Sequence, residues 1–300
     1  MSADDSNSDG SERDGGRNPT RAAVRSALAE VTDPELDRSI VELEYIDDIA
    51  IEPGEPTDLD SAGEYGRIGK YDGIGDLDGT GDLDGSDESG AHVEVSFTLP
   101  TAWCSPAFAW MMAIDGREAV ESLPGVARCE MHLNDHMHAR EVTEGVNGGR
   151  GFEETFPDAD GGIEATRATL DSKARLARQY VAVEALLAAG VTHEQIAAMS
   201  RGDCHRLPGG ESVAIDVRGG ALAVVVDADP LDRYLAKAER VGCFADGDDR
   251  LFRTPEGDPI DPDRGELVHR RARLARVNMD GQGGVCAALH EARRSESARR

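Results

Sequence analysis

A Gly- and Asp-rich stretch at residues 52–91 is the feature that most constrains how this chain can fold. It holds 12 acidic and two basic residues, and the sequence GDLDG occurs in it twice, at 75–79 and 81–85. Such a segment buries too little apolar surface to offset the entropy of ordering it. We therefore expect a disordered acidic insertion at the surface, with folded parts of the chain on either side.

The aspartates of this insertion also resemble a calcium-binding loop. Asp76, Asp78, Asp82 and Asp84 alternate around Gly81. A calcium loop of the helix-loop-helix type also needs flanking helices and a bidentate glutamate, and the sequence shows neither. A solvated acidic loop is the preferred interpretation, with calcium binding as its alternative.

Acidic residues dominate the chain as a whole. Against 59 Asp and Glu stand 32 Lys and Arg, of which three are lysine, and the net charge is −27. This charge repels phosphate backbones and anionic lipid head groups, so we expect neither nucleic-acid nor membrane binding. In molar salt the Debye length falls to about 3 Å, which would screen the repulsion, and the composition therefore indicates a halophilic protein.

The sequence also predicts a cytoplasmic protein. No apolar run approaches the roughly 20 residues that span a bilayer, and the N-terminus lacks the basic and then apolar order of a signal peptide. The five cysteines are widely spaced and form no CxxC pair, so neither a disulfide framework nor a zinc ribbon is expected. Any metal site must be assembled across the fold or between chains.

Apolar periodicity predicts a compact N-terminal domain. A helix pattern starts at Thr20, and residues 40–51 read as a strand. Beyond the insertion, residues 92–99 and 126–133 alternate between apolar and polar side chains, as half-buried strands do. Ser105-Pro106 can start a helix between these two strands. The expected order is α-β-β-α-β, an α+β fold.

The remainder of the chain is expected to be a mainly helical C-terminal α+β region. A long helix is predicted at 163–189 and a hairpin around Gly219-Gly220, with a short helix around Cys286 near the end. The predicted division is a disordered tail (1–19), a first domain (20–144, with the insertion at 52–91), a linker (145–162) and a C-terminal domain (163–295).

Four motifs of the first domain resemble the MIP18 (DUF59) family of iron–sulfur cluster assembly proteins. They are Asp33-Pro34-Glu35-Leu36, Ile40-Val41-Glu42-Leu43, Thr98-Leu99-Pro100-Thr101-Ala102-Trp103-Cys104 and Gly125-Val126. Together they span about residues 20–135. The resemblance implies a role in the assembly or transfer of iron–sulfur clusters, with the cysteine of the Thr-rich loop as the functional thiol.

One departure from the family pattern indicates a long form of the family. Many relatives have proline directly after the cysteine, whereas here Ser105 stands between Cys104 and Pro106. Together with Asn134-Asp135-His136 and the C-terminal extension, this variant resembles longer bacterial relatives linked to the maturation of soluble diiron monooxygenases. The resemblance thus also implies a maturation factor dedicated to one metalloenzyme.

Cys104 is the predicted working residue. It lies just before an expected helix N-terminus, where backbone N–H groups and the helix dipole favour a thiolate. The hydroxyl groups of Thr98 and Thr101 can donate to the sulfur, while Asp33 and Glu35 can bind a metal or hold the backbone of the loop. The alternative is a small buried cysteine in a tight loop.

Two further metal ligands are predicted outside this loop. His136 follows the last strand of the domain together with other histidines, and imidazole suits iron or zinc; a solvated loop is the alternative. Cys286 follows the Gly-rich residues 280–284, a flexible approach that would let its sulfur reach a shared ligand. Its alternative is packing on one face of a helix.

The sequence as a whole predicts a factor for iron–sulfur cluster assembly or transfer, or for metallocentre maturation, rather than a turnover catalyst. Its cofactor would be a transient iron–sulfur cluster or iron, and its partner an apo-metalloprotein client. A homodimer would let two chains share a cluster. The alternatives are an adaptor for a diiron monooxygenase client without a bound cluster, and an enzyme with Cys104 as nucleophile and His136 or His138 as base.

Overall fold

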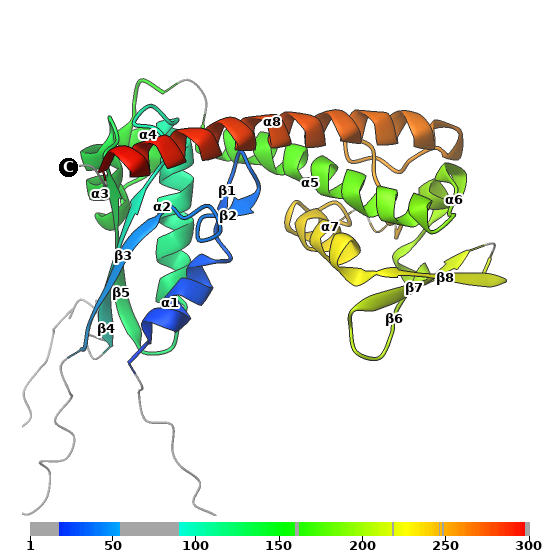
Figure 1. Cartoon of the computed structure of the whole chain (residues 1–300), viewed down its shortest axis with the longest axis horizontal. Coiled ribbons are helices and arrows are strands. Elements are labelled where there is room, and N and C mark those ends of the chain that lie inside the picture. The colour runs from blue at the N-terminus through cyan, green and yellow to red at the C-terminus, as the bar shows by residue number, and fades with distance from the viewer. Residues whose placement is uncertain are drawn as a thin grey trace, which may run out of the picture.

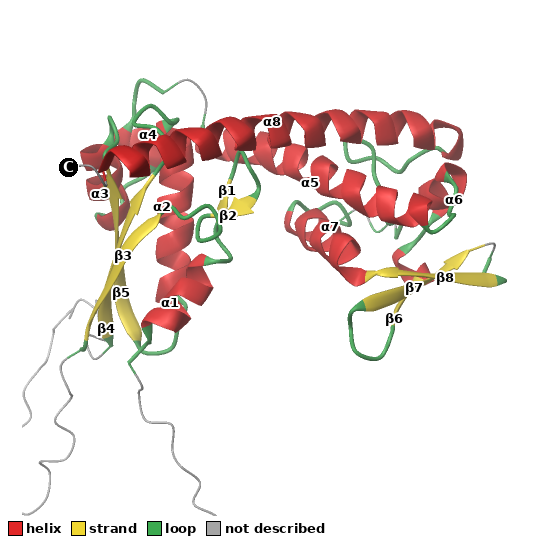
Figure 2. Cartoon of the chain, viewed as in Figure 1, coloured by secondary structure: helices red, strands yellow, loops and turns green. Residues whose placement is uncertain are grey.

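The computed structural model describes residues 18–54, 90–159, 162–217, 219–245, 247 and 249–297, and within them it is a mixed α and β protein (Figures 1 and 2). The mixed class agrees with the prediction. The predicted tail, acidic insertion and calcium loop fall almost entirely outside the described residues. Within the described ranges, no helix is both long enough and apolar enough to cross a bilayer.

The N-terminal half is built around a three-stranded sheet of order β3-β4-β5. Strands β3 and β4 pair antiparallel, and β4 and β5 pair parallel, with α2 as the connection between them. The elements are α1 (Arg21–Leu28), β1 (Thr32–Asp33), β2 (Arg38–Ser39), β3 (Ile46–Glu52), β4 (Ala91–Thr98), α2 (Pro106–Glu121), β5 (Val126–Asn134), α3 (Ala139–Asn147) and α4 (Phe152–Thr155).

Strand alternation explains how this sheet packs. Val93, Val95 and Phe97 are fully buried in the first hydrophobic core, which also contains residues of α1 and α2. His92 and Glu94 point to the opposite face, because successive side chains of a strand alternate. The sheet therefore has one face covered by helices and one face that carries polar side chains.

The N-terminal half differs from the prediction at two places. The strand expected at 40–51 begins only at Ile46, because residues 40–45 form a turn in which Tyr45 N–H donates to the carbonyl of Ile40 at 2.9 Å. Helices α3 and α4 were not predicted, and their Val146 and Phe152 are buried in the first core. Gly145 lets α3 approach α2, since a Cβ there would lie 2.6 Å from the ring of Trp110.

The C-terminal half combines helices with a second three-stranded sheet of order β6-β7-β8. Its elements are α5 (Ile163–Ala188), α6 (His193–Ala198), η1 (Arg201–Asp203), β6 (Cys204–Arg206), β7 (Ser212–Val217), β8 (Leu222–Asp227), α7 (Ala228–Arg240), η2 (Pro262–Arg264) and α8 (Gly265–Ser297). The flexible approach expected at 280–284 is wrong, because these residues lie inside the 33-residue helix α8.

Helix α8 connects the two halves. It runs antiparallel to α5 and continues across the end of the first sheet (Figure 1). Ala174 and Ala177 of α5 and Met279 of α8 are buried together where the two helices touch. The domain division at 145–162 stays a prediction, and the structure places α8 against both of the parts that it would separate.

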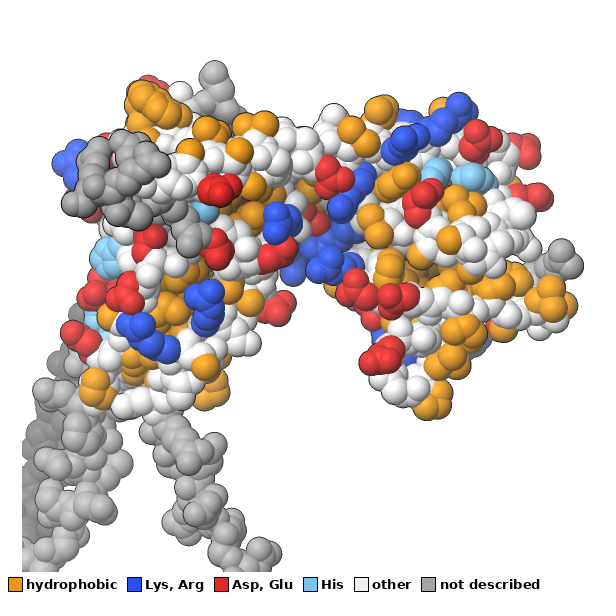
Figure 3. Space-filling model, viewed as in Figure 1, with side chains coloured by type: hydrophobic (Ala, Val, Ile, Leu, Met, Phe, Trp, Pro, Cys, Tyr) orange, Lys and Arg blue, Asp and Glu red, His pale blue; other side chains and the backbone are white. Residues whose placement is uncertain are grey.

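Buried ion pairs also hold the halves together. The side chain of Asp37, in the turn between β1 and β2, accepts hydrogen bonds from Arg178 of α5 and lies 3.7 Å from Nζ of Lys237 of α7. Lys237 pairs in addition with Asp171 and is 4% exposed. Figure 3 shows Lys, Arg, Asp and Glu side chains gathered where the two halves meet. Because these charges are buried, losing one partner leaves another uncompensated.

We predict that Asp37→Asn lowers the free energy of unfolding by about 3 kcal/mol, as expected when one partner of a buried ion pair is removed. Asparagine tolerates the positive φ of 52° at this position, so the change isolates the charge. Urea unfolding in molar salt, followed by circular dichroism, measures the loss. Asp48→Asn is the control, since its pair with Arg21 is exposed and should contribute less than about 1 kcal/mol. Equal losses in both variants would contradict the prediction.

Candidate functional site

The parallel pairing of β4 and β5 brings two loops to one end of the first sheet. Residues 99–104 follow β4, and residues 135–138 follow β5. Tyr45 lies at the same end, because β3 runs antiparallel to β4 and the Tyr45 carbonyl accepts from Thr98 N–H at 2.9 Å. The carboxyl ends of parallel strands are where ligands bind in many α/β proteins.

Helix α8 docks on this end through Arg293. Its guanidinium donates to the carbonyl of Leu99 at 2.8 Å and to the carbonyl of Asp135 at 2.7 Å, and it pairs with the Asp135 carboxylate at 3.2 Å. One side chain thus joins the residues that follow both parallel strands. This contact places the last turns of α8 beside the Cys104 loop.

The half-buried thiol of Cys104 has a polar neighbour in its own loop. Thr101 Oγ1 lies 3.3 Å from Cys104 Sγ and accepts from Trp103 N–H at 3.2 Å. Because Thr101 accepts that bond, its own O–H is free to donate to the sulfur. Pro106 starts α2 two residues later, as expected, with Ser105 at the N-cap.

His136 holds the Cys104 loop from the other strand. Its Nδ1 accepts from the backbone N–H of His138 at 3.1 Å, so Nε2 carries the proton and donates to the carbonyl of Cys104 at 2.9 Å. Burial lowers the pKa of His136 below its usual value. Both ring nitrogens are occupied in this arrangement, so His136 holds the Cys104 loop, and its predicted role as a metal ligand would require one of these two hydrogen bonds to break.

Helix α8 brings a second thiol to the site. Burial, and then the charges of Asp33, Cys104 and Glu35, raise the pKa of Cys286 to about 11. The two cysteines are therefore near enough for the charge of one to oppose ionisation of the other. This places the predicted ligands Cys104 and Cys286 in one region, although they lie far apart in the sequence.

Asp33 organises the turn beside these thiols. Its Oδ1 accepts from the backbone N–H groups of Glu35 at 2.8 Å and Leu36 at 3.0 Å, and its Oδ2 accepts from the Tyr45 hydroxyl at 3.2 Å. Burial raises the pKa of Asp33 in spite of these bonds. Burial and the charge of Asp33 also raise the pKa of Tyr45. Of the two roles predicted for Asp33, these contacts match that of holding the backbone.

Glu35 faces the two long helices. Its Oε1 accepts from Gln282 Nε2 of α8 at 2.9 Å, and Gln282 Oε1 accepts from Lys173 Nζ of α5 at 2.8 Å. Burial, and then the charge of Asp33, raise the pKa of Glu35, while Lys173 lowers it. The motif that contains Asp33 and Glu35 is thereby tied to both helices that cross between the halves.

A groove between α8 and residues 42–45 contains an unpaired imidazole. Cys286 and His290 line this groove with Tyr45, and the rings of Tyr45 and His290 meet edge to face at 5.6 Å. Both ring nitrogens of His290 are buried without a hydrogen-bond partner among the described residues. Buried polar atoms of this kind point to a missing partner, such as an ion.

The structure separates the remaining predicted residue, Thr98, from the thiols. The Thr98 hydroxyl donates to Asp47 Oδ2 at 2.7 Å, because strand alternation turns it away from the face of its buried neighbour Leu99. Cys129 is fully buried in the first core, where burial raises its pKa to about 12. Cys204 and Cys243 pack against the second core.

Sequence reasoning missed Tyr45, Gln282, His290 and Arg293. The last three lie with Cys286 at spacings of three or four residues, which places them on one face of a helix. That periodicity was available in the sequence. The glycines at 281, 283 and 284 obscured it, because they indicate a loop.

Comparison with known proteins identifies one similar family. Residues 21–56 match the model of a family described as iron-sulfur cluster assembly protein. The matched segment contains α1, the Asp33 turn, Tyr45 and β3, and it ends before the Cys104 loop. The chain matches no curated protein and no solved structure.

We predict that alkylation of Cys286 by iodoacetamide in the native protein rises with pH around a midpoint near 11, where an ordinary thiol would have its midpoint near 9. Burial and neighbouring negative charges favour the unreactive thiol below that pH. Asp33→Asn should move the midpoint only part of the way from about 11 toward 9, because burial contributes more to the raised pKa of Cys286 than the charge of Asp33 does. Peptide mass spectrometry after short labelling pulses measures the rate, and the urea-unfolded chain is the control. A native midpoint equal to the unfolded one would refute the prediction.

Proposed function

We propose that this protein is an iron–sulfur cluster assembly or transfer factor, or a metallocentre maturation factor, and that Cys104 and Cys286 hold its cargo. The observation that carries the proposal is the position of both thiols beside the Asp33 turn. This turn belongs to residues 21–56, which match iron–sulfur cluster assembly proteins, whereas the thiols themselves lie outside the matched segment. The cargo is iron or a labile cluster, which the protein receives and passes on.

The donors at this site fit iron. Thiolates bind iron in clusters, and imidazole and carboxylate groups are common additional ligands of iron. The site offers two cysteines, the unpaired imidazole of His290 and the carboxylate of Glu35. Thr101 and His136 would orient the Cys104 loop around the cargo. Protonated thiols must lose their protons when they bind metal, so loading is expected to be favoured by higher pH.

The finer assignment is a long form of the MIP18 family. It is supported by the Cys104 loop between β4 and α2, and by a C-terminal extension whose last helix contributes Cys286. An apo-metalloprotein is the proposed client. Two thiols from each chain would complete the four ligands of a common cluster, so we propose that the loaded form is a homodimer.

The contacts of Cys104 give less support to the enzyme alternative. A cysteine nucleophile needs a base within hydrogen-bond reach of the thiol. His136 bonds to the carbonyl oxygen of Cys104, and the sulfur lies against the Thr101 hydroxyl. The adaptor alternative differs from the proposed function in a simple way, because it requires no iron on the protein.

We predict that anaerobic reconstitution with ferrous iron and sulfide in molar salt loads the wild-type protein, and that Cys104→Ala abolishes loading. Cys286→Ala should lower the cluster content, because it removes the second thiol. Iron and sulfide analysis, absorbance and Mössbauer spectra measure the outcome. Cys243→Ala is the matched control, since this half-buried cysteine packs against the other core.

Equal cluster content in wild type and Cys104→Ala would overturn the proposed role of this thiol. Iron retained without sulfide would favour maturation of a mononuclear or diiron centre over cluster transfer. Absence of iron from the wild type would favour the adaptor. Transfer of the cluster to an apo-ferredoxin, followed by its absorbance, would test delivery directly.

A further inference from the structure

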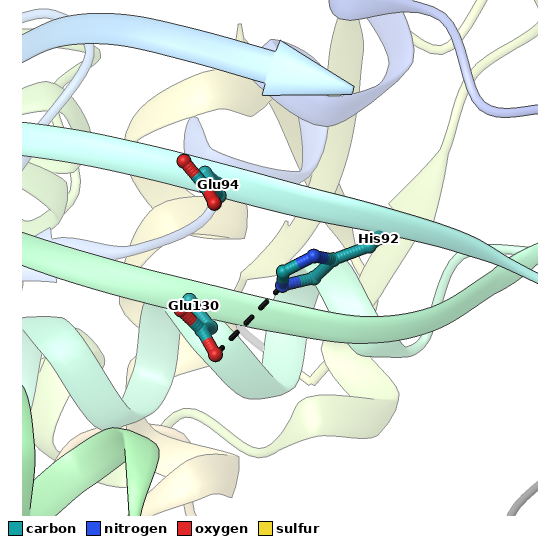
Figure 4. A group of neighbouring side chains, drawn as sticks. All are labelled: His92, Glu94 and Glu130. Atoms are coloured by element: carbon teal, nitrogen blue, oxygen red, sulfur yellow. Dashed lines mark ion pairs between the residues drawn. The ribbon is translucent and has the colours of Figure 1, made fainter. Parts of the chain in front are cut away.

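The polar face of the first sheet carries a second group of metal-binding side chains. His92 and Glu94 lie on β4 and Glu130 lies on β5, all on the face turned away from the core. Figure 4 shows the three side chains on the two neighbouring strands. One ligand atom from each lies within 4.8 Å of the other two. This face is separate from the sheet end that holds Cys104.

Strand register forces two negative charges together at this point. Glu94 and Glu130 are directly opposed in the parallel pairing of β4 and β5. Two carboxylates held side by side on neighbouring strands repel each other, and a nearby cation lowers the energy of both. A positive charge on this face would therefore stabilise the two carboxylates.

Two imidazole groups flank the same carboxylate without bonding to it. His92 Nε2 lies 3.8 Å from Oε1 of Glu130, and His132 Nε2 lies 3.6 Å from Oε2. Both nitrogens are buried and lack a hydrogen-bond partner among the described residues. Buried polar atoms in native proteins are normally satisfied, and an unplaced ion is one explanation for exceptions.

Arg128 supplies a positive charge to the carboxylate. Its guanidinium lies 2.6 Å from Glu130 Oε1, and its side chain is 56% exposed. The Glu130 side chain is 22% exposed. Because the guanidinium is largely in solvent, the pair contributes modestly and can separate. Arg128 would then compete with a bound ion for Glu130.

We propose that His92, Glu94 and Glu130 bind a divalent transition-metal ion on the polar face of the sheet. One imidazole and two carboxylates suit zinc, ferrous iron or manganese. Ligand distances of about 2.1 Å in a tetrahedral site place the donor atoms about 3.4 Å apart, so small side-chain rotations complete the site. His132 lies outside the three ligands, with its Nε2 3.6 Å from Oε2 of Glu130, where it can hold Glu130 in place once the ion binds, as neighbouring groups do at metal sites.

The test uses the full chain with Cys104→Ala and Cys286→Ala, so that the two thiols of the candidate site bind no metal. Titration calorimetry with Zn²⁺ alone, in molar KCl, should show one ion per chain. His92→Gln or Glu130→Gln should weaken this binding by more than about tenfold. Loss of a group that only supports a ligand already lowers metal affinity by about tenfold or more, and these changes remove a ligand itself. Glu141→Gln is the matched control, because Glu141 lies on α3, is not one of the three proposed ligands, and pairs with Arg140 at 3.8 Å.

Arg128→Gln gives a second, opposite expectation. It should tighten Zn²⁺ binding by about two- to fivefold, because the ion no longer has to displace Arg128 from Glu130 and such a pair contributes less than about 1 kcal/mol. Arg140→Gln should leave the affinity unchanged. Circular dichroism checks that each variant is folded. Zn²⁺ binding that is equal in the parent chain, His92→Gln and Glu130→Gln would place the ion on other groups and overturn the proposal. Absence of binding in both the parent chain and Arg128→Gln would do the same.

Discussion

The docking of α8 on the end of the first sheet is the contact on which the thiol site depends. Arg293 donates to the carbonyls of Leu99 and Asp135, and its rigid planar guanidinium fixes where the helix can lie. His290 and Cys286 precede it by about one and two helical turns, so the same contact sets their positions. Without this docking, Cys104 would have no second thiol nearby.

Strong local signals allowed much of the fold to be predicted from the sequence. Alternation at 92–99 and 126–133 predicted β4 and β5, and Ser105-Pro106 predicted the start of α2. Gly190, with a φ of 89°, ends α5 close to its expected boundary. In these places the chain follows local propensity, because the tertiary contacts require the same conformation. The position of the Cys104 loop, between a strand and a helix, follows from these elements.

The rest of the site could not be predicted because it depends on contacts between distant segments. Gly281, Gly283 and Gly284 each disfavour a helix by about 1 kcal/mol relative to alanine, yet α8 continues through them. Gln282 stands among these glycines and bonds to Glu35 and Lys173. Tertiary contacts thus override local propensity in this segment. The pairing of Tyr45 with Asp33 depends likewise on a turn that the sequence suggested was a strand.

The two proposed metal-binding regions differ in a way that follows from their places in the fold. Glu94 opposes Glu130 wherever β4 and β5 pair, so the carboxylate group is set as soon as the sheet forms. Cys104 and Cys286 come from a loop and from a distant helix, so the thiol site exists only while α8 is docked. A fixed site of imidazole and carboxylate suits an ion that stays. Under the proposed function, a site that is held together only by the contacts of a docked helix suits cargo that must leave.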